Sequence, residues 1–211
     1  MSFIIGIIYF NLFILHHKLN TMRKTLLTAF IIFALSINAG AQLYKSVLPS
    51  TAFTESISKI TQDFRNNYYQ VQGEQLSADG DMDTYKSLVT VPAAKRCVIY
   101  RFHSKVDTTA SWQAMMYEGD SYNEAVKIYK NTCRLVDKSN VKLTGGSSVS
   151  FSGKINEPDA GIRFVTSSYK LNSKDPAYEK FYAEVELVNI NFDQWEVHLN
   201  LQSKKDDAEK D

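Results

Sequence analysis

The sequence predicts an α+β fold in which two helices pack on an antiparallel sheet. Two segments carry apolar residues at helical spacing, and the segments between and after them are β-type runs separated by turn formers. The predicted order is helix, three strands, helix and four strands. This order suggests two similar halves, although no residue repeat is visible.

The first helix is predicted from an apolar stripe that follows Pro49 and a capping residue, Ser50. The members of the stripe are three or four residues apart, as expected for one face of a helix: Phe53, Ile57, Ile60, Phe64 and Tyr68. The helix is expected to end near Tyr69.

Residues 77–83 are predicted to form an acidic loop. Asp79, Asp81 and Asp83 alternate as in a calcium-binding loop, but Thr84 and Thr90 stand where such a loop requires glycine and glutamate. A solvated turn is therefore expected, and no metal site is predicted.

Three strands are predicted over residues 84–91, 96–103 and 111–117, with Pro92 breaking the chain between the first two. The second helix opens with Ser121-x-x-Glu124, a capping box, and Asn140 is expected to stop it. Its buried stripe is predicted to include Ala125, Ile128, Tyr129, Thr132, Cys133 and Val136.

Four strands are predicted to follow, over residues 147–155, 162–171, 181–190 and 194–202. In the last of them apolar and polar residues alternate, which predicts one buried and one solvated face. The apolar set is Trp195, Val197, Leu199 and Leu201, and the polar set is Gln194, Glu196, His198 and Asn200.

Residues 22–41 are predicted to be a cleavable signal peptide, since basic residues precede a short apolar run and Ala39-x-Ala41 precedes Gln42. Residues 1–21 are interpreted as an N-terminal extension from a start codon placed too early, with a two-part membrane anchor as the alternative. Residues 42–202 then form a single domain, and residues 203–211 form a disordered charged tail. A periplasmic or extracellular location follows, with no stable membrane span after cleavage.

The formal net charge of +1 argues against a nucleic-acid partner, because a phosphate-binding surface carries a basic excess. No cofactor motif is recognised. Cys97 and Cys133 leave two alternatives open: a structural disulfide, which export would permit, or two buried free thiols.

Two functions are considered. The first is a non-enzymatic domain that binds an envelope protein, peptide or glycan through an aromatic surface on its sheet, with Trp112, Tyr117, Tyr169 and Tyr182 as candidate residues. The alternative is an envelope hydrolase whose site combines His198 with Glu184, Glu186 and Glu196 from the C-terminal strands. A deep pocket with converging carboxylates would favour the enzyme.

A signal peptide that ends in Ala41-Gln42 ahead of an α+β domain resembles exported proteins of Bacteroidota-type bacteria. In element order alone, the domain is also similar to the tandem helix-and-sheet folds of exported inhibitor proteins and to secretion chaperones. These resemblances imply export and fold class, and they assign no residue a role.

Overall fold

The computed structural model describes residues 48–104, 108–159, 161–191 and 194–203. The predicted N-terminal extension, signal peptide and residues 204–211 of the predicted tail lie outside these ranges. Ser203 is the last residue of a strand, so the folded part runs one residue beyond its predicted end.

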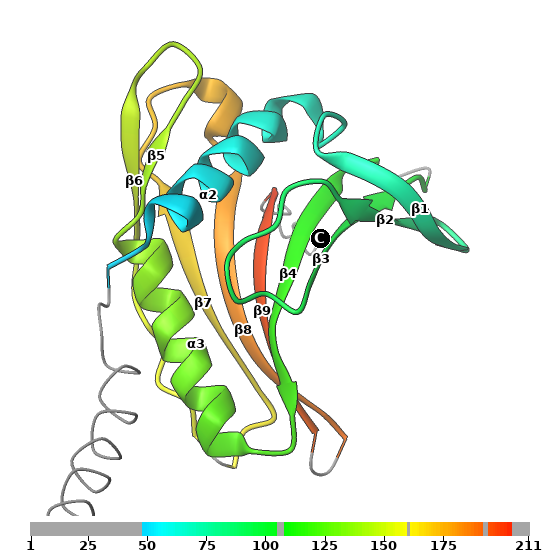
Figure 1. Ribbon diagram of the computed structural model, residues 1–211, viewed down its shortest axis with the longest axis vertical. Helices are drawn as coiled ribbons and strands as arrows, with labels where there is room; N and C mark the ends of the chain where they lie inside the picture. The colour runs from blue at the N-terminus through cyan, green and yellow to red at the C-terminus, as the bar shows by residue number, and fades with distance from the viewer. Residues whose placement is uncertain (1–47, 105–107, 160, 192–193, 204–211) are drawn as a thin grey trace, which may run out of the picture. The chain divides into compact units, whose positions relative to one another are not determined.

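The described residues form two α-helices and one antiparallel sheet of nine strands, which confirms the α+β class and the predicted order (Figure 1). The helices are α2 (Thr51–Asp63) and α3 (Tyr122–Asp137). The strands are β1 (Gln72–Asp79), β2 (Met82–Ser87), β3 (Arg96–Phe102), β4 (Ala110–Gly119), β5 (Asn140–Lys142), β6 (Ser148–Gly153), β7 (Phe164–Leu171), β8 (Phe181–Asn191) and β9 (Gln194–Ser203). Neither helix is long and apolar enough to cross a membrane, within the ranges described.

Each helix is followed by an antiparallel meander, and the two meanders join through β4 and β9. The sheet order is β1-β2-β3-β4-β9-β8-β7-β6-β5. The longest strands, β4, β8 and β9, therefore lie side by side in the middle of the sheet, with the other strands of the first meander on one side of them and those of the second meander on the other.

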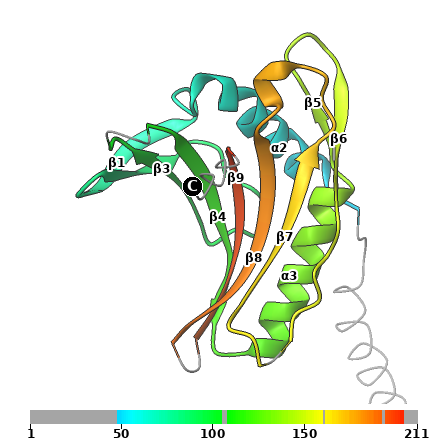
Figure 2. The same ribbon diagram turned by 180° about the vertical axis from the view of Figure 1, so that it is seen from behind.

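Both helices cover the same face of the sheet. From the end of α2, the ring of Phe64 contacts that of Phe181 on β8 at a centroid distance of 4.7 Å. From α3, Tyr129 Oη lies 2.6 Å from Ser167 Oγ on β7. Figure 2 shows the molecule from behind, with β7 and β8 in front of α2. A single core thus fills the space between the helices and one side of the sheet.

Local signals set the helix starts as predicted. Ser50 Oγ accepts a hydrogen bond from the Phe53 amide at 3.2 Å, and Ser121 Oγ accepts one from the Glu124 amide at 3.3 Å. The prediction that Asn140 stops the second helix was wrong: α3 ends at Asp137 and Asn140 begins β5. Asn140 instead pairs with Ser150 in the ladder between β5 and β6.

The predicted loop over residues 77–83 is also corrected, because these residues belong to a hairpin of β1 and β2. Gly80, with φ of 56°, makes the turn, and Asp79 pairs with Met82 across it. The strand β1 escaped prediction because its residues are mostly polar and exposed. It forms one edge of the sheet, whereas the other edge, β5, is held by α2 through the Lys142 amide and Ser58 Oγ at 3.1 Å.

Tyr129 makes the fold sensitive to alkaline pH. Burial raises its pKa to about 12, against the opposing effect of its hydrogen bond with Ser167. A raised pKa means that the folded state holds the proton more tightly than the unfolded state does, so stability present below pH 10 is lost as pH rises through 12. Burial also raises the pKa values of Tyr68 and Tyr169.

We therefore expect the free energy of unfolding to fall between pH 10 and about 12, and to fall less steeply in Tyr129→Phe. Urea titrations at a series of pH values measure this dependence. Equal pH slopes for the wild type and the variant would contradict the assignment.

Candidate functional site

The face of the sheet opposite α2 and α3, called here the open face, carries an ordered set of polar side chains across its centre. Cross-strand pairing aligns one row over five strands: Val98, Gln113, Asn200, Glu184 and Ser168. Hydrogen bonds join its members, since Gln113 Nε2 donates to Asn200 Oδ1 at 3.0 Å and Ser168 Oγ donates to Glu184 Oε1 at 2.9 Å. These hydrogen bonds hold the polar side chains of the row in fixed positions.

The neighbouring row contains the histidine and the carboxylates that the hydrolase hypothesis named. Met115 and Glu186 flank His198 on the adjacent strands. The Nε2 atom of His198 lies 2.8 Å from Glu196 Oε2, and its Nδ1 atom lies 3.8 Å from Glu186 Oε2. The structure thus brings together three of the four predicted residues, while Glu184 is bound to Gln202 Nε2 at 2.6 Å.

Both ring nitrogens of His198 face carboxylates, and this arrangement limits what the histidine can do. A catalytic histidine of the nucleophilic type uses one nitrogen to meet an orienting carboxylate and the other to meet the nucleophile. Here Glu196 and Glu186 occupy both directions, and the histidine side chain is 13% exposed. The cluster is therefore suited to fixing the surface of the central strands rather than to proton transfer.

A cavity of about 670 Å³ opens beside these rows, at the β1 side of the sheet. Its lining combines residues of β1, β2 and β3 with the loop that joins β2 to β3: Glu74, Leu76, Ser77, Thr84, Lys86, Ser87, Thr90, Lys95, Arg96, Cys97, Val98 and Tyr100. Pockets that bind small molecules have volumes of roughly 300–1,000 Å³ and few polar groups on an apolar lining, so this cavity has a suitable size. We call it the β1–β3 pocket.

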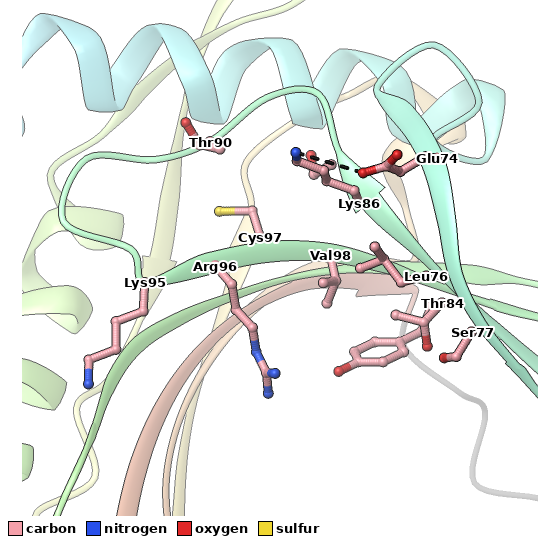
Figure 3. Close-up of a pocket in the computed structure, with 12 residues that line it drawn as sticks. Glu74, Leu76, Ser77, Thr84, Lys86, Thr90, Lys95, Arg96, Cys97 and Val98 are labelled. Atoms are coloured by element: carbon pink, nitrogen blue, oxygen red, sulfur yellow. Dashed lines mark ion pairs between the residues drawn. The ribbon is translucent and has the colours of Figure 1, made fainter.

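The β1–β3 pocket exists because β2 and β3 separate at one end. Their pairing runs from Met82–Phe102 to Lys86–Val98, so Arg96 and Cys97 extend beyond it. The connecting loop bends away here, with Ala93 at φ of 67°. Figure 3 shows that Arg96 and Val98 extend to one side of β3 and that Cys97 extends to the other, toward Thr90. The cavity thus passes from the open face around the end of the paired strands.

Irregular pairing on β1 also shapes the pocket. The register between β1 and β2 shifts twice, between Gln72 and Gln75 and between Gln75 and Ser77. Such bulges bend a strand and re-aim its side chains. As a result, Glu74, Leu76 and Ser77 all line the cavity, although strict alternation would separate neighbouring residues.

The structure corrects part of the predicted aromatic surface. Trp112 and Tyr169 are fully buried in the core, each with 0% exposure. Tyr117 is half-buried, and its hydroxyl accepts a hydrogen bond from the Ser121 amide at 3.3 Å, so it supports the start of α3. Only Tyr182 of the four belongs to the open face, where it pairs with Gln202. Tyr169 shares the buried face of β7 with Leu171.

Cys97 and Cys133 are both buried and free, so the structure contains two thiols and no bond between them. Burial raises the pKa of each thiol, which keeps both protonated at neutral pH. Cys133 packs among Tyr129, Ser167 and Tyr169. Cys97 reaches the wall of the β1–β3 pocket.

Within the described ranges, no group of histidine, cysteine and acidic residues is arranged to hold a metal ion. Asp83 illustrates why the aspartates of the β1–β2 hairpin are not gathered: its carboxylate accepts hydrogen bonds from Gln75 at 3.1 Å and Tyr85 at 3.3 Å. These contacts hold the hairpin together.

Sequence reasoning missed the β1–β3 pocket. Its residues come from three strands and a loop, and only the register shifts and the parting of β2 from β3 bring them together. The one available signal was Pro92, which predicted an irregular connection at this position. No protein-family model, curated protein or solved structure matches the chain.

Proposed function

We propose that this protein is a non-enzymatic binding protein of the cell envelope that holds a small ligand in the β1–β3 pocket. The observation that carries the proposal is the cavity of about 670 Å³, lined by both apolar and charged side chains. Export, which the sequence predicts, would place this binding outside the cytoplasm. An N-terminus at Gln42 in protein recovered from the producing cells is the expected mark of that export.

The open face supports this function by making the pocket wall rigid. Val98 and Met115 are only 6% and 2% exposed, although neither helix covers this side of the sheet. Gln113 pairs with Val98 across β3 and β4, and its side chain is fixed by a hydrogen bond to Asn200 at 3.0 Å. A preformed wall lowers the ordering cost of binding.

The hydrolase alternative draws on the same face, but its histidine has both nitrogens directed at carboxylates. The carboxylates beside His198 therefore stabilise the ring, and no hydroxyl or thiol nucleophile is hydrogen-bonded to it among the described residues. We accordingly place the function in the β1–β3 pocket rather than at His198.

Filling the pocket tests the proposal. Thr84 lines the cavity on β2, so Thr84→Trp should occupy part of it and weaken binding of the uncharged dye Nile red by roughly tenfold or more. Fluorescence titration of the full-length chain measures the affinity. Ser168→Trp is the matched control, because Ser168 is exposed on the open face of β7 and does not line the pocket.

The wild type and Ser168→Trp should show the same saturable binding. The proposal fails if Thr84→Trp, shown by circular dichroism to be folded, binds the dye as tightly as they do.

A further inference from the structure

The charges around the β1–β3 pocket are unequal. Three cationic residues line it, Lys86, Lys95 and Arg96, against one carboxylate, Glu74. The chain as a whole has a formal net charge of only +1, so this local excess is not a reflection of overall composition. A concave site with an excess of one sign concentrates ligands of the opposite sign.

The single carboxylate does little to neutralise the three cations. Glu74 Oε1 lies 3.9 Å from Lys86 Nζ, and the two side chains are 71% and 63% exposed (Figure 3). Exposed ion pairs of this kind contribute little and exchange readily. Lys86 is therefore free to turn toward a ligand in the cavity.

The other two cations have no carboxylate partner in the described part of the chain. Lys95 Nζ donates to the backbone oxygen of Glu118 at 2.6 Å and lies 5.8 Å from the ring centroid of Tyr117. The backbone of Arg96 belongs to the β3–β4 ladder, opposite Met115, whereas its side chain forms no hydrogen bond or ion pair with any described residue. The charges of Arg96 and Glu196 act on the pKa of Tyr100 in opposite directions, Arg96 lowering it and Glu196 raising it, and Glu196 is bound to His198 at 2.8 Å.

Apolar and hydroxyl groups complete the lining. Leu76, Val98 and Cys97 provide apolar contact, and Thr84 and Thr90 provide hydroxyl groups. The planar fork of an arginine suits a carboxylate or a phosphate, which can accept two parallel hydrogen bonds from it. The site thus matches a molecule with one anionic head group and a short apolar body.

We infer that the β1–β3 pocket binds a soluble organic anion, with its carboxylate or phosphate group at Arg96 and Lys86 and its apolar part against Val98 and Leu76. This inference rests on the proposed function, since it names the ligand class of the same pocket. It adds that the ligand is negatively charged and that Arg96 contacts the charged group.

Isothermal titration calorimetry of the full-length chain with three matched eight-carbon probes tests the sign of the ligand's charge. Octanoate should bind, and it should bind roughly tenfold more tightly than octanol or octylamine. Arg96→Gln should weaken octanoate by roughly tenfold and leave octanol unchanged. Arg134→Gln is the control, because it removes an exposed arginine from α3, away from the pocket.

A second arm distinguishes a soluble anion from a membrane surface. The amount of protein that sediments with phosphatidylcholine vesicles containing phosphatidylglycerol should be the same for the wild type and Arg96→Gln. Octyl phosphate, used below its micellar concentration, should bind the protein as octanoate does. Arg96-dependent sedimentation without octanoate binding would overturn the inference.

The inference is also overturned if octylamine or octanol binds as tightly as octanoate, or if Arg96→Gln does not alter octanoate affinity. The proposed function would survive these results provided that Nile red binding still depends on Thr84. If Nile red binding did not depend on Thr84, the proposed function itself would be contradicted.

Discussion

Trp112→Ala should destabilise the protein by about 3–5 kcal/mol, because it leaves a large cavity in the centre of the core. Trp112 is 0% exposed and lies on the helix-facing side of β4, between Ile99 on β3 and Leu201 on β9. Its Nε1 atom donates to Ser87 Oγ at 2.8 Å, which ties β4 to the end of β2. Since domains are stable by only about 5–15 kcal/mol, this loss is a large part of the total.

Chemical denaturation monitored by circular dichroism measures the effect. Trp112→Phe is the matched control, since it keeps an aromatic ring and removes the indole donor, and Ser87 Oγ retains its contacts with Val89. We expect a clearly smaller loss for this variant. A stable Trp112→Ala variant that loses only ligand binding would show that Trp112 is a surface residue, as the sequence had suggested.

Asp63→Ala should cost about 3 kcal/mol, because it removes a buried charged acceptor from the turn that follows α2. Asp63 is 3% exposed. Its Oδ2 atom accepts hydrogen bonds from the amides of Gln70 and Val71 at 2.8 Å and 2.9 Å. These contacts hold a strained turn, in which Asn67 and Tyr68 have φ values of 51° and 62°.

Asp63→Asn separates the effect of the charge from that of the oxygen atom, because a single amide oxygen in the place of Oδ2 can still accept from both backbone amides. Its stability, measured by urea unfolding at neutral pH, should lie between those of the wild type and Asp63→Ala. If Asp63→Ala unfolds at the same urea concentration as the wild type, the carboxylate does not support the turn.

The sequence predicted the elements whose signals are local. Ser50 and Ser121 begin helices because their hydroxyl groups satisfy free amides a few residues ahead. The alternation of Val197, Leu199 and Leu201 predicted the buried face of β9, and these three residues are fully buried. In each case the information lies within one turn of helix or one strand.

The features that escaped prediction depend on contacts between distant segments. The edge strand β1 is polar because only β2 pairs with it, so it lacks the apolar pattern of a buried strand. The environment of His198 was only partly foreseeable, since Glu196 is on the same strand whereas the register with β8 decides that Glu186 faces it. The position of Arg96 at the pocket gave no signal in the sequence, because it depends on where the pairing of β2 with β3 ends.

Binding in the β1–β3 pocket is tested by the backbone amide chemical shifts of the isotope-labelled full-length chain. During titration with octanoate, we expect saturable chemical-shift changes concentrated in Thr84 to Ser87 and Arg96 to Tyr100, with the shifts of α3 unchanged. Shift changes confined to α3 and β7, or none at saturating octanoate, would contradict binding in this pocket.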